Sequence, residues 1–111
     1  MSAFRKLEKK ITGQGLETTH ESTINYIIRI VGKYYDVEDD YVLNKKRDRR
    51  LVHPRQMAMH LCHKFVPISL TDIGKHFGKD HSTVIYSARI IESHASIDKN
   101  IKNQLKELEN I

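Results

Sequence analysis

Four consecutive polar residues lie where a helix is expected to begin: Asp80, His81, Ser82 and Thr83. Asp80 is a favoured N-cap, and the apolar residues that follow it, Val84, Ala88 and Ile91, recur at helical spacing. The carboxylate, imidazole and hydroxyl groups of the four polar residues can donate and accept hydrogen bonds, which suits recognition of a polar ligand. Adjacent helical residues diverge by about 100°, and no nucleophile or oxyanion hole accompanies the Asp-His pair. We therefore expect a binding surface and not an enzyme.

A second, shorter helix is expected immediately before this one. The capping-box spacing of Ser69 and Asp72 marks its start, and Gly78 supplies a tight turn at its end. Its apolar stripe consists of Leu70, Ile73 and Phe77. Two helices joined in this way form a helix-turn-helix, in which the first residues of the second helix meet base edges in the major groove.

The net charge of +5 is concentrated between Asn44 and Arg55. This segment contains six basic residues and one acidic residue, Asp48. Its net charge of +5 accounts for the whole excess of positive charge in the chain. The basic residues are Lys45, Lys46, Arg47, Arg49, Arg50 and Arg55. A run of this kind is also the composition of an ordinary solvated loop, but beside a helix-turn-helix it indicates a nucleic acid partner.

Helical periodicity continues through the other parts of the chain, and strand patterns are absent. A core helix is expected over 21–35, with Thr18 and Glu21 at capping-box spacing, followed by one helical turn at 41–43. Pro54 suits the first position of a helix over 55–65, because its missing N–H would have no partner there. Such a start places Arg55 and Gln56 in the first turn, where free backbone N–H groups suit a phosphate.

The second helix of the helix-turn-helix is expected to run to about His94, and a last helix over 98–110. The predicted fold is therefore all-α, with five or six helices. The length allows one compact domain, which we place at 21–111, with an N-terminal extension or linker at 1–20.

Three groups of residues in register resemble the C-terminal DNA-binding domain of the bacterial replication initiator DnaA. They are PRQMAM from Pro54, the pairs SL, IG and FG between Ser69 and Gly78, and DHSTV with RIIE between Asp80 and Glu92. Their order and spacing agree from about residue 22 to residue 108. The resemblance implies a Trp-repressor-like helical fold that binds a short asymmetric duplex element, the DnaA box, in replication initiation or its regulation.

The resemblance also implies roles for individual residues. Arg47 would enter the minor groove, Arg55 and Gln56 would contact phosphates, and Thr83 would contact the DNA backbone. Asp80, His81 and Ser82 would face major-groove bases. The full set expected at double-stranded DNA is Lys46, Arg47, Arg49, Arg55, Gln56, Leu70, Thr71, Lys79, Asp80, His81, Ser82 and Thr83.

Two features set this chain apart from the usual family pattern. Gly78 is followed directly by Lys79, where the family usually has a second glycine, so the turn is expected to be one residue shorter. No Gly-Lys pair precedes Ser or Thr, so no P-loop and no nucleotide cofactor are expected.

His60, Cys62 and His63 suggest a metal, but the two histidines lie about 300° apart on a helix, and we expect no metal site.

The single Cys62 cannot form an internal disulfide, and the N-terminus lacks the apolar core of a signal peptide, which agrees with a cytoplasmic setting. No apolar run is long enough for integral membrane association. Residues 1–20 form either a basic amphipathic helix on a membrane surface or partner, or a loosely docked leader. The competing function is a protein-interaction module or stand-alone regulator that binds the replication initiator, a regulatory protein or another acidic partner.

Overall fold

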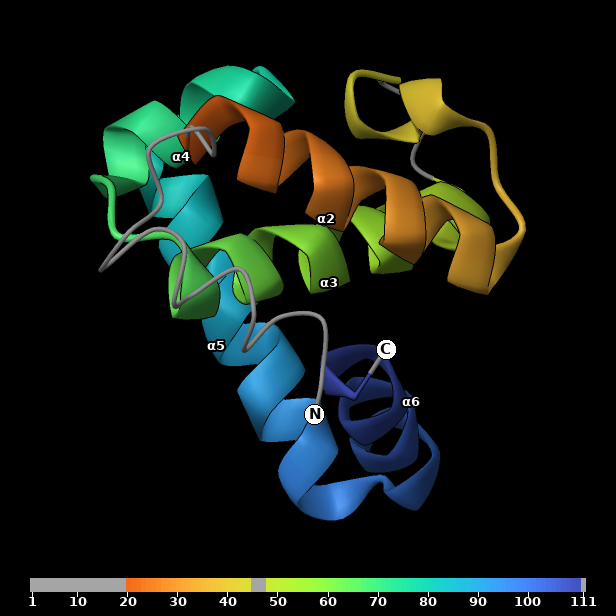
Figure 1. Ribbon diagram of the computed structural model, residues 1–111. Coiled ribbons are helices and arrows are strands. Elements are labelled where there is room, and N and C mark those ends of the chain that lie inside the picture. Colours follow the sequence, from red (N-terminus) through yellow and green to blue (C-terminus); the bar gives the residue numbers. More distant parts are fainter. Residues whose placement is uncertain (1–19, 45–47, 111) are drawn as a thin grey trace.

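The computed structural model describes residues 20–44 and 48–110, and within these ranges the chain is all-α (Figure 1). One short 3-10 helix and five α-helices follow in chain order. They are α2 (His20–Tyr35), η1 (Asp39–Val42), α3 (Arg49–Phe65), α4 (Leu70–Phe77), α5 (His81–Ile97) and α6 (Lys99–Glu109). The predicted all-α class, the core helix and the single helical turn after it are confirmed. The proposed extension at 1–20 lies outside the described residues apart from His20.

Helix α3 lies at the centre of the fold, where it packs against α2, α4, α5 and η1. Figure 1 shows α2 crossing α3, while α5 runs from the α4 end of the molecule to a corner where the chain turns back into α6. The start of α5 is therefore at the opposite end of that helix from α6 (Figure 1). None of the described helices is both long and apolar enough to cross a membrane.

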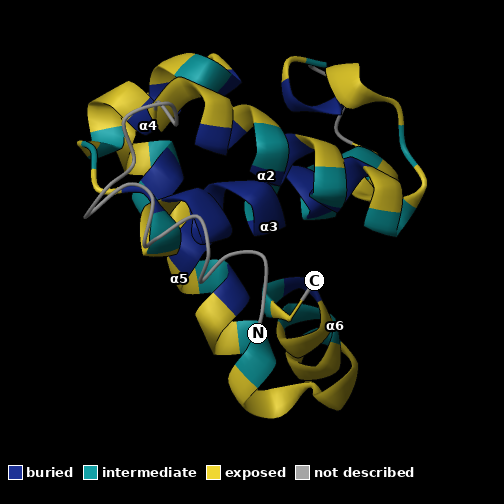
Figure 2. Cartoon of the chain, in the orientation of Figure 1, coloured by how far each residue is buried: buried dark blue, intermediate teal, exposed yellow. Residues whose placement is uncertain are grey.

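The core is built from the apolar stripes that the helical period predicts. Ile24, Ile27 and Val31 of α2 are fully buried against α3, and Figure 2 shows the buried residues gathered where α2, α3 and α5 meet. Tyr41 of η1 is also fully buried, and its hydroxyl donates to the backbone carbonyl of Ile28 at 2.9 Å. That bond satisfies a buried polar group and fixes η1 on α2.

Helix α3 begins at Arg49 and not at Arg55, so the predicted start is wrong. Asp48 is the N-cap, and its side chain accepts from the backbone N–H of Arg50 at 3.0 Å. Pro54 lies inside the helix, where it cannot donate to the carbonyl of Arg50 in the first turn and its ring crowds that carbonyl. Pro54 is buried and Leu51 is partly buried, so this part of the helix packs against the rest of the fold.

Helix α6 is held to the rest of the fold by a polar cluster. The Tyr35 hydroxyl donates to Gln104 Oε1 at 2.7 Å, and His53 Nε2 lies 3.0 Å from the same oxygen. Asp98 ends α5 and caps α6, because its side chain accepts from the backbone N–H of Asn100 at 2.8 Å. The last helix is thus confirmed, and α5 is one turn longer than expected.

Candidate nucleic-acid interface

The turn between α4 and α5 depends on two glycines. Gly78 has a left-handed backbone, with φ 63° and ψ 33°, which most side chains disfavour. The backbone N–H of Lys79 then donates to the carbonyl of Gly74 at 2.9 Å, which closes the turn. A Cβ atom at Gly74 would lie 2.3 Å from the carbonyl oxygen of Lys79, so this close approach requires glycine there.

Asp80 is the N-cap of α5, as its type and position predict. Its carboxylate accepts from the backbone N–H of Thr83 at 2.9 Å. Hydrogen bonding from the backbone and side chain of Thr83 holds the pKa of Asp80 below its ordinary value. Asp80 therefore remains ionised at neutral pH and orients the leading turn of the helix.

His81 and Ser82, on that leading turn, are exposed, Thr83 is half-buried, and Val84 is fully buried. The side chains of α5 thus change from exposed to buried within its first four residues. Since the buried stripe begins only at Val84, the imidazole and the Ser82 hydroxyl remain available to a ligand. Lys79, in the turn before them, is exposed as well.

The start of α4 forms a neighbouring polar edge. Ser69 caps the helix by accepting from the backbone N–H of Asp72 at 3.1 Å, as its spacing predicts. Thr71 is exposed and Leu70 is half-buried. The first N–H groups of a helix have no intrahelical partner, so this end is suited to a phosphate.

Arg55 does not occupy the place expected for it. Because α3 begins at Arg49, Arg55 lies in the second turn, where its side chain is only 6% exposed. Its guanidinium Nη1 donates to the backbone carbonyl of Tyr41 at 3.4 Å, and burial lowers the pKa of the guanidinium. Gln56 is half-buried. The first turn of α3 instead presents Arg49 and Arg50, both exposed.

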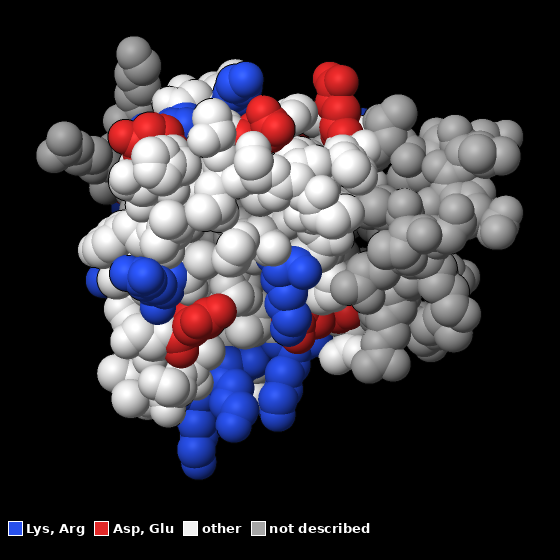
Figure 3. Space-filling view, turned by 90° about the vertical axis from the view of Figure 1, so that its left-hand side faces the viewer, with Lys and Arg blue, Asp and Glu red and all other residues white. Residues whose placement is uncertain are grey.

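Arg49 is among the residues expected at DNA, but the sequence-based interpretation placed Arg49 and Arg50 in a basic loop and not at a helix start, although the N-cap type of Asp48 was the available signal. Lys46 and Arg47 lie outside the described residues. Exposed basic residues also occur on α6, namely Lys99, Lys102 and Lys106. Figure 3 shows Lys and Arg side chains gathered at the lower end of the molecule, where α5 meets α6, besides isolated ones nearer the helix-turn-helix.

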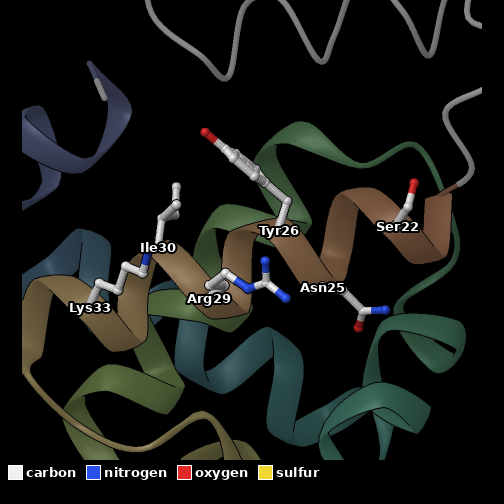
Figure 4. Close-up of a pocket in the computed structure, with 6 residues that line it drawn as sticks. All are labelled: Ser22, Asn25, Tyr26, Arg29, Ile30 and Lys33. Carbon is white, nitrogen blue, oxygen red and sulfur yellow. The ribbon is translucent and has the colours of Figure 1, made fainter.

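Two hollows lie beside α2. The larger, of about 410 Å³, is lined within the described part of the chain by residues of α2: Ser22, Asn25, Tyr26, Arg29, Ile30 and Lys33 (Figure 4). The smaller, of about 290 Å³, lies between α2, η1 and α4 and includes Arg29, Asp39 and His76. Neither brings together a nucleophile, a base and an oxyanion donor in the way that an active site requires.

His60 and Cys62 are buried in α3. No group of three or more metal-binding side chains occurs within 20–44 and 48–110. Burial raises the pKa of the Cys62 thiol and lowers the pKa of His60. Among the described residues, neither ring nitrogen of His60 has a hydrogen-bond partner.

Comparison with known proteins agrees with this geometry. The family described as bacterial dnaA protein helix-turn-helix matches residues 24–91. The chromosomal replication initiator protein DnaA of Caldanaerobacter subterraneus subsp. tengcongensis is 37% identical over 90 residues, which is 81% of this chain and 20% of that protein. The DnaA protein of Bacteroides thetaiotaomicron is 33% identical over 94 residues, 84% of this chain and 20% of the relative.

The DnaA protein of Brucella abortus biovar 1 is 38% identical over 89 residues, which is 79% of this chain and 18% of that protein. The chain thus spans about one fifth of the length of these curated relatives. The matched residues include most of α2, all of η1, α3 and α4, both glycines of the turn and the exposed start of α5. The chain therefore belongs to the bacterial DnaA helix-turn-helix family.

Proposed function

We propose that this domain binds double-stranded DNA sequence-specifically at a DnaA-box-like element, in replication initiation or its regulation. One observation carries the proposal. The leading turn of α5 presents His81 and Ser82 to solvent, directly after a turn whose geometry requires Gly74 and Gly78. A rigid turn that ends in an exposed polar helix start is the arrangement by which a helix-turn-helix reads the major groove.

The side chains of the leading turn of α5 carry hydrogen-bonding groups that suit contacts to base edges and to the DNA backbone. The His81 imidazole can donate or accept one hydrogen bond at a base edge, and the Ser82 hydroxyl can do either. Asp80 orients the helix by capping it and, as an anion, can accept from a cytosine amino group. Lys79 and Thr83 flank the reading residues and are proposed to contact the DNA backbone.

Phosphate contacts are proposed at two helix starts, that of α4 with Leu70 and Thr71 and that of α3 with Arg49 and Arg50. Both starts lie at the positive end of a helix dipole, and the start of α3 adds the exposed side chains of Arg49 and Arg50. Gln56 is proposed to contact a phosphate from the second turn of α3.

Arg55 receives a revised role. Because its guanidinium is buried on the Tyr41 carbonyl, we assign it to holding η1 against α3, and thereby to positioning the basic segment that follows η1. Within that segment, Lys46 and Arg47 are proposed to approach the minor groove, where a narrow A·T-rich groove attracts arginine.

The test is fluorescence anisotropy of a labelled DnaA-box duplex and of a scrambled duplex of equal composition. We expect tight, saturable binding to the box and weaker, more salt-sensitive binding to the scrambled duplex. Equal affinity for both would overturn sequence specificity. Failure to bind either at low salt would overturn DNA binding itself and favour the protein-interaction alternative.

A further inference from the structure

Tyr86 continues the exposed face of α5 beyond the leading turn. It follows Ser82 by four residues, so the two side chains share one side of the helix, with Arg89 three residues further on. Val84, Ala88 and Ile91 make up the opposite, buried side. Tyr86 is 59% exposed, which makes it one of the few large aromatic or apolar side chains that the described residues leave in solvent.

The height of Tyr86 on the helix matches the depth of the major groove. At 1.5 Å per residue, Tyr86 lies about 6 Å along the axis from Ser82, and Arg89 lies about 10.5 Å from it. The groove is about 8.5 Å deep and 12 Å wide. With Ser82 at the base edges and α5 entering start first, Tyr86 lies below the rim of the groove and Arg89 lies beyond it.

The tyrosine side chain also fits the lateral distance. Half the groove width, about 6 Å, separates a centred helix axis from the sugar-phosphate wall, which is within the reach of a side chain that projects from the helix surface. A phenol can lay its ring against sugar carbons while its hydroxyl donates to a phosphate oxygen.

We propose that Tyr86 is a further DNA contact, donating its hydroxyl to a phosphate on the wall of the major groove and thereby fixing how deeply α5 is inserted. The proposal rests on the proposed function, since it places α5 in the groove. Tyr86 is a positioning residue that carries no base information itself. Its effect on specificity acts through the depth at which His81 and Ser82 meet the bases.

The first measurement compares Tyr86→Phe with the parent chain on the DnaA-box duplex. Removing only the hydroxyl is expected to lower affinity about tenfold, the order of a hydrogen bond to a charged group. Tyr86→Ala should weaken binding further, because the ring contact is lost as well. The matched control is Tyr26→Phe on α2, where Figure 4 shows the ring projecting outward beside Arg29 and Ile30. Melting curves of all variants should coincide within about 2 °C, as for surface substitutions.

The second measurement locates the contact. Single methylphosphonate linkages, which remove the charge of one phosphate, are placed in turn along both strands of the box. At one wall phosphate the neutral linkage should weaken the parent but leave Tyr86→Phe unchanged, because the contact is already absent. Parallel losses in the parent and the variant at every position would overturn the assignment.

The outcomes separate this inference from the proposed function. If the parent binds the box and Tyr86→Phe binds equally well, only the role of Tyr86 is refuted. If the parent itself fails to bind the box, the proposed function is refuted first. A variant that melts several degrees lower than the parent would show Tyr86 to be structural and would likewise overturn the inference.

Discussion

His81 is exposed three positions before the fully buried Val84, so its environment is set by solvent and not by the core. We predict that His81→Ala leaves thermal stability nearly unchanged. The same substitution should lower the ratio of specific to non-specific affinity by about 1 to 3 kcal/mol, the usual worth of a base contact.

The measurement is a melting curve beside binding to the box and to a box altered at one major-groove position. The control is His63→Ala, another exposed histidine, which lies on α3. If His81→Ala melts several degrees lower and discriminates between the duplexes as the parent does, His81 has a structural role.

His60 is the opposite case, a histidine that is 4% exposed and whose ring nitrogens have no hydrogen-bond partner in the part of the chain that the structure describes. Burial lowers its pKa, Lys64 and His63 act in the same direction, and Glu92 and Glu109 oppose them. The folded state therefore favours the neutral ring. The free energy of unfolding is therefore unaffected by His60 above the unfolded-state pKa of about 6.5. It decreases as pH falls below that value, because the unfolded chain binds the proton more readily than the folded one.

We predict that His60→Met, which keeps volume without a titrating group, loses less stability than the parent between pH 7.5 and pH 5. Urea unfolding at both pH values gives the difference, and His63→Met serves as the exposed control. Identical pH dependence in the parent and His60→Met would show that His60 does not carry this acid sensitivity.

Among the elements, the first turn of α3 depends on Asp48. Its carboxylate accepts from the backbone N–H of Arg50, and the N–H groups of Leu51 and Val52 bond to its carbonyl, both at 2.9 Å. We predict that Asp48→Ala costs about 1 kcal/mol of unfolding free energy, the typical worth of an N-cap. It should also weaken DNA binding, since Arg49 and Arg50 lie on the turn that frays.

Asp48→Ser is the matched comparison, because a serine hydroxyl also caps a helix while removing the negative charge. Urea unfolding should place it close to the parent. If Asp48→Ala and Asp48→Ser are equally destabilised, the loss arises from charge and not from capping.

The boundaries that the sequence predicted correctly are those with a strong cap beside an unbroken apolar stripe. Ser69, Asp80 and Asp98 each mark a helix start, and each side chain makes the capping bond in the structure. The start of α3 is different, because Pro54 predicts a first helical residue whereas the cap at Asp48 starts the helix at Arg49 and leaves Pro54 inside it. Burial of Arg55 depends on where η1 passes over α3, a tertiary contact with no local signal.

At the scale of the whole molecule, positive charge lies near two parts of the fold. The start of α3 contributes Arg49 and Arg50, close in sequence to the basic residues 45–47, and α6 contributes three exposed lysines. Counting charge along the chain assigned the whole excess to residues 44–55. In that count, acidic residues elsewhere in the chain cancel the charge of the α6 lysines. In the structure, however, Glu109 of α6 forms an ion pair with Lys64 of α3 and does not neutralise a lysine of α6.

Binding through the helix starts and the basic segment makes affinity depend on salt. About five to seven phosphate contacts should give a slope of log affinity against log salt of roughly −4.5 to −6.3, because each neutralised phosphate contributes about −0.9. Replacing Arg50 with Gln should make the slope shallower by about one contact on both the box and the scrambled duplex. Replacing Lys102 with Gln, on α6 at the far end of α5, should leave it unchanged. Titrations between 50 and 200 mM salt measure these slopes. A slope near zero for the parent would contradict phosphate binding, and equal effects of the two substitutions would show that duplex DNA also reaches α6.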